Sequence, residues 1–210
     1  MVKAKIYDYN GPIMDIDPFW DFLKDKYPEL YHNYKVIGDK DQSIKLKHRP
    51  QVLGLYDEAL NKGLFPAVLI PNAAGRLEKD VSSGYTPFIF TTVPLETVVR
   101  QAEEMGITQY FPGSNIITVA QLAKDQKLAP NLQKEDPAMY IALMRYLRGR
   151  DVDSFETYVD DAEKRVMAAH KANEMSAENR IQRLYLFNKT LQAPDPVKPY
   201  KTINDVMMVE

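Results

Sequence analysis

The chain has 210 residues, of which 45% are hydrophobic and 27% charged, which predicts a soluble globular protein with one sizeable core and room for a small accessory module. Its formal net charge of -2 gives no broad electrostatic reason to expect a nucleic-acid partner. Cysteine is absent, which excludes disulfides, thiolate metal sites and cysteine nucleophiles. The three histidines, His32, His48 and His170, are too far apart in the sequence to indicate a zinc site.

Targeting and membrane signals are not evident in the sequence. The residues before the first acid, Asp8, contain no apolar run of signal-peptide length, and no stretch approaches the roughly 20 apolar residues of a membrane span. We therefore expect a cytoplasmic protein with no membrane partner. No heptad seam or long edge strand indicates an oligomeric state.

The first predicted strand covers residues 4–9. The Gly11-Pro12 pair that follows forces a turn, because glycine and proline are the strongest local breakers of regular structure. An acid, Asp8, therefore stands at the end of the first strand.

The next residues, 14–65, interrupt the pattern that follows them. A helix is predicted from Asp17, a polar, lysine-rich passage at 37–49, and a second helix at 51–62. We interpret the whole passage as an insertion over the sheet. The expected domains are a core of residues 1–13 and 66–210 and a small inserted domain of residues 14–65.

Strand and helix patterns alternate in the second half of the chain. Pro94 and Pro137 each suit the first turn of a helix, and an earlier helix at 73–83 ends at Gly84. Strands are predicted at 86–90, 115–119, 155–160 and 181–187. This alternation implies an α/β fold in which helices cover both faces of a parallel sheet with right-handed crossovers.

Residues that can carry chemistry stand at the predicted element ends: Asp8, Thr91, Lys134 and the acid pair Asp160-Asp161. In an open α/β sheet, ligands bind just beyond the carboxyl ends of the strands. A carboxylate such as Asp8 can attack a phosphoryl group once the phosphoryl charge is neutralised. Mg²⁺, which prefers oxygen ligands, and Lys134 would together neutralise that charge.

Each of these residues also has an ordinary structural interpretation. One of the acids Asp160 and Asp161 can cap the helix that follows, because carboxylates are favoured at helix N-termini. Asp8 can be a turn residue, Thr91 can cap the helix at Pro94, and Lys134 can be a solvated loop charge. The residues alone leave both interpretations open, although the structural one would need several coincidences of order.

Four motifs in order resemble those of the haloacid dehalogenase (HAD) superfamily, and the resemblance spans nearly the whole chain. They are Ile6-Tyr-Asp8-Tyr-Asn10-Gly11, Phe88-Ile-Phe-Thr91-Thr92, Lys134-Glu-Asp-Pro137 and Val159-Asp160-Asp161 with the helical residues that follow to Asn173. The insertion lies where the family carries a substrate-selecting cap.

The resemblance implies a HAD-like Rossmannoid three-layer α/β sandwich with a parallel sheet and a small helical cap inserted after the first strand. It implies a Mg²⁺-dependent phosphohydrolase that acts on a small phosphorylated substrate through an aspartyl phosphate on Asp8. The implied residues are Asp8 and Asn10 for catalysis, Thr91, Thr92 and Lys134 for phosphate binding, and Asp8, Asn10, Asp160 and Asp161 as metal ligands.

Three positions depart from the family pattern. Asn10 replaces the second aspartate, which protonates the leaving group and later activates water; Pro12 replaces a threonine; and Arg165 stands where another Asp or Asn is frequent. An amide cannot exchange a proton near neutral pH, and losing a general acid/base costs about 10²- to 10⁴-fold in rate.

Two functions remain open at this point. One is a slow phosphohydrolase that accumulates aspartyl phosphate, because Asn10 cannot activate water for the second step. The other is a non-catalytic protein that uses the same pocket to bind a phosphorylated ligand or a protein partner. Restored turnover in Asn10→Asp would distinguish the first from the second.

Overall fold

A computed structural model describes residues 1–129, 132–176, 179–188, 199–203 and 206–209. The chain forms two compact units, a core unit of Met1–Met14 and Leu69–Glu210 and an insertion unit of Asp15–Val68. Two short strands, β2 (Met14–Asp15) and β3 (Val68–Leu69), pair where the chain passes from one unit to the other. These bounds lie close to the expected ones, and the function of the insertion as a cap stays a prediction.

The core unit is built on a six-stranded sheet in which every pairing is parallel. Its strand order is β5-β4-β1-β6-β7-β8, so that the first strand of the chain lies inside the sheet between β4 and β6. The strands are β1 (Val2–Tyr7), β4 (Tyr85–Thr91), β5 (Ile116–Thr118), β6 (Val152–Asp160), β7 (Ile181–Phe187) and β8 (Lys201–Ile203).

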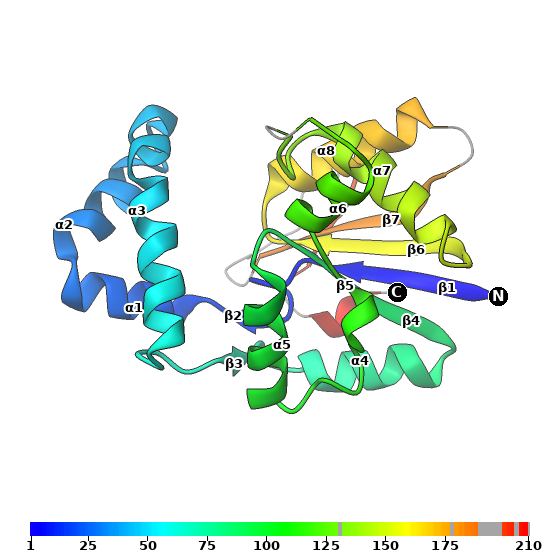
Figure 1. Ribbon diagram of the computed structural model, residues 1–210, viewed down its shortest axis with the longest axis horizontal. Helices are drawn as coiled ribbons and strands as arrows, with labels where there is room; N and C mark the ends of the chain where they lie inside the picture. Colours follow the sequence, from blue (N-terminus) through cyan, green and yellow to red (C-terminus); the bar gives the residue numbers. More distant parts are fainter. Residues whose placement is uncertain (130–131, 177–178, 189–198, 204–205, 210) are drawn as a thin grey trace. The chain divides into compact units, whose positions relative to one another are not determined.

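Helices cover both faces of this sheet, which confirms the predicted α/β class. In Figure 1, α7 and α8 lie above the sheet and α4 lies below it. The helices are α4 (Ala73–Ser82), α5 (Leu95–Glu104), α6 (Val119–Asp125), α7 (Pro137–Arg148) and α8 (Glu163–Met175). Two 3-10 turns, η2 (Gly113–Asn115) and η3 (Val206–Met208), complete the described elements of the unit.

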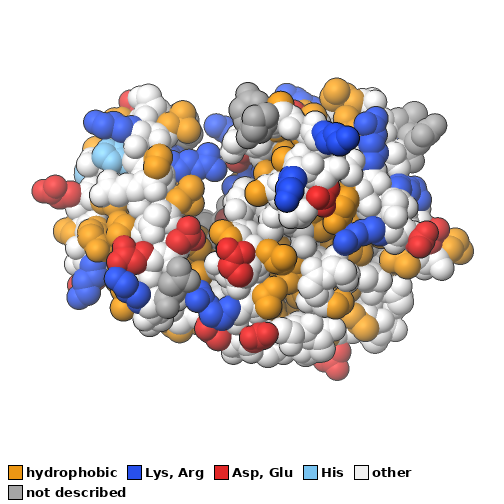
Figure 2. Space-filling model, viewed as in Figure 1, with side chains coloured by type: hydrophobic (Ala, Val, Ile, Leu, Met, Phe, Trp, Pro, Cys, Tyr) orange, Lys and Arg blue, Asp and Glu red, His pale blue; other side chains and the backbone are white. Residues whose placement is uncertain are grey.

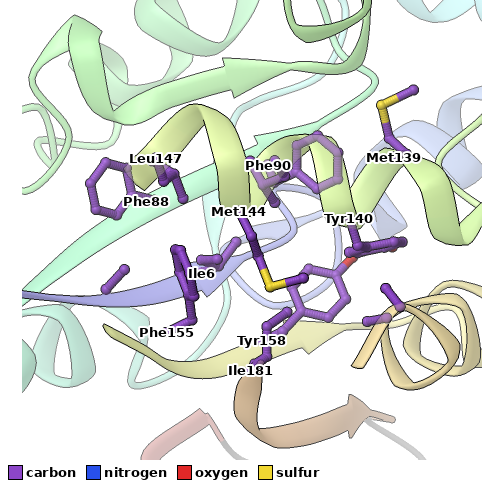
Figure 3. Close-up of a cluster of buried hydrophobic side chains, with 14 of the residues drawn as sticks. Ile6, Phe88, Phe90, Met139, Tyr140, Met144, Leu147, Phe155, Tyr158 and Ile181 are labelled. Carbon is purple, nitrogen blue, oxygen red and sulfur yellow. The ribbon is translucent and has the colours of Figure 1, made fainter. Parts of the chain in front are cut away.

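The two faces of β1 differ in chemistry, since side chains alternate along a strand. Ala4 and Ile6 belong to the main hydrophobic cluster, where Figure 3 shows Ile6 among the side chains of β4, β6 and α7. Lys5 and Tyr7 alternate with them and bind the buried Asp80 of α4 instead. Asp8 follows the strand directly, at its carboxyl end.

The insertion unit is helical and has an aromatic core of its own. It contains α1 (Asp17–Lys26), α2 (Pro28–Tyr31), the π-helix η1 (His32–Ile37) and α3 (Gln42–Asn61). The ring of Phe19 lies 5.0 Å from that of Tyr56 and 5.5 Å from that of Phe65, in the range of favourable aromatic pairs.

Two helices, α3 and α6, are among the elements that differ from the sequence prediction. The second helix was predicted to begin at residue 51, but α3 begins nine residues earlier, inside the polar passage, because Asp41 accepts a hydrogen bond from the Ser43 amide at 2.9 Å and caps the helix there. Pro50 lies inside that helix. The short helix α6, which Thr118 caps, was not predicted at all.

Charged side chains of both signs are interspersed on the face of the described residues that Figure 2 shows. Among the described residues, no helix is both long enough and apolar enough to cross a membrane.

Candidate active site

The carboxyl edge of the sheet brings three of the four sequence motifs together. Asp8 follows β1, Thr91 ends β4 and Asp160 ends β6, and β1 pairs with both of the other strands. The Asp8 amide donates a hydrogen bond to Val159 O at 2.7 Å, which fixes the backbone of Asp8 beside β6. Strands on opposite sides of β1 thus present their ends at one place, where open α/β sheets bind ligands.

Lys134 joins the motifs through its ammonium group. Its Nζ donates to Asp8 Oδ1 and to Phe90 O, each at 2.7 Å, and lies 2.9 Å from Asp160 Oδ2. The side chain is fully buried. It stands in the turn before α7, whose first residues are fixed by Pro137 and by Asp136, which accepts a hydrogen bond from the Ala138 amide.

Arg165 completes the cluster from the first turn of α8. Its Nη1 lies 3.2 Å from Asp8 Oδ2 and 3.6 Å from Asp160 Oδ1, and its Nε donates to Glu135 Oε1 at 3.1 Å. In the sequence, Arg165 stands out only as a departure from the fourth motif. We call Asp8, Lys134, Asp160 and Arg165 the site cluster.

Within the site cluster, Asp160 is the more fully neutralised carboxylate. Oδ1 accepts from the Ala162 amide at 2.9 Å in the turn before α8. Asp160 does not cap that helix, whose N-cap residue is Ala162. Oδ2 accepts from the Tyr158 hydroxyl, which in turn lies 3.0 Å from the Tyr140 hydroxyl. Burial raises the pKa of Asp160, but the charges of Lys134 and Arg165 outweigh it and hold that pKa below its ordinary value.

The pKa of Asp8 is shifted in the opposite direction, upward. Burial and the negative charge of Asp160 raise the pKa of Asp8, and Lys134 and Arg165 offset this only in part. The pKa of Asp161 is raised as well: although the residue keeps an exposed surface, desolvation of its carboxyl group, followed by the charges of Asp160 and Asp8, raises this pKa to about 8.

Gly11 makes the close approach of Asp161 possible. A Cβ on Gly11 would lie 2.7 Å from Asp161 Cβ and 2.9 Å from Asp161 Oδ2, and Gly11 has a φ of +97°. Both space and backbone conformation therefore require glycine here. The family motif's glycine has a local physical reason in this chain.

The remaining predicted site residues lie nearby without joining the cluster. Thr91 is buried and its Oγ1 accepts from the Val93 amide at 3.1 Å, whereas Thr92 is exposed. No hydrogen bond in the described part of the chain connects either threonine to Asp8 or Lys134. Asn10 Oδ1 is buried and has no hydrogen-bond partner among the described residues, which leaves an acceptor available.

Three carboxylates form the possible donor set for the Mg²⁺ that the resemblance implies. Asp8, Asp160 and Asp161 each offer an oxygen, and these oxygens lie within 4.8 Å of one another. However, both oxygens of Asp8 and both oxygens of Asp160 already face Lys134 or Arg165. A divalent cation fits these carboxylates only if Arg165 withdraws, so the arrangement as it stands does not fit resident Mg²⁺.

Solved structures share this fold. An L-2-haloacid dehalogenase superimposes with a TM-score of 0.66 at 12% identity, over 98% of this chain and 96% of that one. A HAD-hydrolase from Bacillus subtilis bound to magnesium gives 0.62 at 12% identity, over 98% and 96%. A Thermotoga maritima protein described as a beta-phosphoglucomutase gives 0.59 at 16% identity, over 91% and 88%.

These matches confirm, at the level of the fold, the resemblance that the four motifs predicted. The chain has the HAD-like fold, an α/β parallel sheet flanked by helices, with the motif residues at the carboxyl edge of that sheet. No protein-family profile matches the sequence, and no curated protein matches it. Since one fold hosts many reactions, the activity has to be argued from the site.

Proposed function

We propose that the chain is a hydrolase that uses Asp8 as its nucleophile on a small phosphomonoester. The placement of Asp8 supports this proposal. One of its carboxylate oxygens accepts a hydrogen bond from Lys134, and the other accepts one from Arg165. Phosphoryl transfer needs positioning and charge neutralisation more than covalent help from the protein. Two fixed cations beside a carboxylate nucleophile supply both requirements.

The reaction has two steps. An Asp8 oxygen bonds to phosphorus while the bond from phosphorus to the leaving oxygen breaks, and a solvent proton completes the leaving alcohol. Water then attacks phosphorus, the bond to Asp8 breaks, and one proton of that water returns to solvent. Lys134 and Arg165 neutralise the charge of the phosphoryl oxygens in both steps, and neither step uses Mg²⁺.

Asn10 makes this a slow enzyme. Its amide cannot protonate a leaving alkoxide or take a proton from water, so the second step suffers most and aspartyl phosphate accumulates. The unpartnered Asn10 Oδ1 can still accept a hydrogen bond from a substrate hydroxyl.

Phosphate release from a panel of phosphomonoesters tests the proposal. Asp8→Asn keeps the size of the side chain and its acceptor oxygen but removes the nucleophile, so turnover should fall by about 10⁴-fold or more. Labelled phosphate that stays on the protein in acid after a single turnover would identify the covalent intermediate. This label should be absent from Asp8→Asn. Equal turnover in both proteins contradicts the role of Asp8, and binding of phosphorylated ligands without turnover in either supports the non-catalytic alternative.

A second candidate is hydrolytic dehalogenation of a small organic acid, and Asn10 is the observation that favours it. An Asp8 oxygen would displace halide from carbon, and water would then hydrolyse the ester to give a hydroxy acid and a proton. Halide leaves with its electron pair and needs no general acid, so Asn10 costs nothing in that step. Three of the solved structures with this fold are described as dehalogenases.

Halide release from 2-haloacids, measured beside phosphate release, separates the two candidates. Phosphate release alone supports the first candidate, and halide release alone supports the second. In both cases Asp8→Asn must abolish the activity.

A further inference from the structure

Arg165 occupies a place in the site cluster that belongs, in chemical terms, to a metal ion. It lies between Asp8 and Asp160 and contacts one oxygen of each, while Lys134 contacts the other oxygen of each. Each carboxylate is therefore bridged to the other twice, once by an ammonium and once by a guanidinium.

The charges of the site cluster balance without a further ion. Two buried carboxylates face two cationic groups, and buried carboxylates are tolerated only when such partners compensate them. A divalent cation placed on the same oxygens would stand beside both cations at short range, where repulsion is strong because the surroundings are poorly solvated.

Arg165 is also held firmly in this position. Glu135, next to Lys134 in the chain, accepts from Arg165 Nε at 3.1 Å and so anchors the guanidinium through a different nitrogen from Nη1, which contacts the carboxylates. The side chain keeps 18% of its surface exposed, unlike Lys134, which is fully buried. Arg165 is thus the cation of the cluster that remains accessible to an incoming ligand.

We infer that Arg165 replaces the metal ion of this site: it excludes Mg²⁺ from Asp8 and Asp160 and neutralises an anionic substrate directly. The exclusion of Mg²⁺ follows from the ion pairs alone. The contact of Arg165 with substrate rests on the proposed function, in which a phosphomonoester approaches Asp8.

Calorimetric titration with MgCl₂ tests the exclusion without any assay of activity. Wild type and Arg145→Gln, which removes an exposed arginine of α7 outside the cluster, should show no specific binding. Arg165→Gln, which frees oxygens of both carboxylates, should gain EDTA-reversible binding at least about tenfold tighter than wild type. Arg165→Lys keeps the charge and should resemble wild type.

The wild-type titration decides the matter even if Arg165→Gln does not fold, which circular dichroism would reveal. Specific, EDTA-reversible Mg²⁺ binding by wild type overturns the inference, and so does a folded Arg165→Gln that gains none. Loss of wild-type turnover in EDTA also overturns it, whereas turnover that EDTA leaves unchanged supports it.

Failure of the proposed function would be recognised separately. If neither phosphate nor halide is released under any condition, the hydrolase proposal fails, and the Mg²⁺ titrations still determine whether Arg165 excludes the ion.

Discussion

Two buried charge clusters flank the first strand, and they illustrate different uses of the same physics. The Asp80 cluster consists of Lys5, Tyr7, Arg76 and Asp80, with Lys5 Nζ at 3.0 Å and Arg76 Nη2 at 2.7 Å from Asp80 Oδ1. Its charged side chains are at most 3% exposed. The site cluster also balances carboxylates with cations, but its Arg165 is 18% exposed and the neighbouring Asp161 is exposed.

The two clusters differ in whether their charged groups are accessible to solvent and ligands. Arg76 additionally binds the carbonyl oxygen of Val209, so the Asp80 cluster ties β1, α4 and the end of the described chain together. Burial lowers the pKa of Lys5 and raises that of Tyr7 far above its ordinary value, and both groups are closed off from solvent. We interpret the Asp80 cluster as structural and the site cluster as functional.

The largest expected effect separates the clusters by stability. Asp80→Ala leaves the cations of Lys5 and Arg76 buried without their carboxylate, so the free energy of unfolding should fall by about 3–5 kcal/mol. Urea denaturation measures this, with Asp21→Ala, an exposed aspartate of α1, as a control expected to change by less than about 0.5 kcal/mol. Activity per folded molecule should be unchanged in Asp80→Ala; a selective loss of activity would erase the distinction between the clusters.

Asn10→Asp should sharpen the functional side of the comparison. The new carboxyl group supplies the general acid/base that the site lacks, so steady-state phosphate release should rise by about 10²-fold or more. The same charge change at Asn33→Asp, in the insertion unit, controls for net charge and should leave turnover as it is. An unchanged rate in Asn10→Asp would mean that proton transfer does not limit the proposed reaction.

A smaller effect concerns pH and Asp161. Its pKa of about 8 lies above the ordinary value of about 3.9, so between these values the folded protein holds a proton that the unfolded chain has lost. The free energy of unfolding therefore contains a contribution from Asp161 that declines as pH rises through this window and levels off above it.

Asp161→Asn mimics the protonated carboxyl at every pH and removes this dependence. The variant should match wild type near pH 4 and become progressively more stable than wild type up to pH 8, by less than the full shift implies because the side chain is exposed. Thermal or urea unfolding across this range measures the difference. A constant difference at all pH values would show that Asp161 titrates normally.

The sequence predicted the fold better than it predicted the cluster, for a physical reason. Hydrophobic periodicity and turn residues are local, so β7 at 181–187 and the starts of α1 and α7 were predicted correctly. Helix α3 began earlier than predicted because one cap, Asp41, outweighed a polar, proline-containing stretch. Helix α6 was not predicted because its seven residues are too few to show a clear helical periodicity of apolar residues.

The site shows where sequence-based prediction ends. Motif order placed Asp8, Lys134 and Asp160 near one another, but the contact of Arg165 with Asp8 joins residues 157 positions apart through a long side chain. No local pattern encodes such a contact. The Asp80 cluster could have been noticed in the sequence, because Arg76 and Asp80 are four residues apart on one helix and Lys5 stands between the apolar residues Ala4 and Ile6.

The smallest expected effect tests whether the site cluster depends on the hydrophobic core beneath it. Tyr140 and Tyr158 lie side by side in the main cluster of apolar side chains, as Figure 3 shows. Their hydroxyl groups are hydrogen-bonded to each other, and the Tyr158 hydroxyl donates to Asp160. Tyr140→Phe keeps the aromatic ring and removes only the hydroxyl. The free energy of unfolding should fall by about 1 kcal/mol, the usual net value of one buried hydrogen bond.

Because Tyr158 remains able to donate to Asp160, turnover in Tyr140→Phe should stay within about threefold of wild type. Tyr146→Phe, at a partly exposed tyrosine on the same helix, is the matched control and should be close to wild type in both measurements. If Tyr140→Phe instead lowered turnover by orders of magnitude with little loss of stability, the tyrosine pair would belong to the catalytic apparatus, and the functional region would extend into the core between α7 and β6.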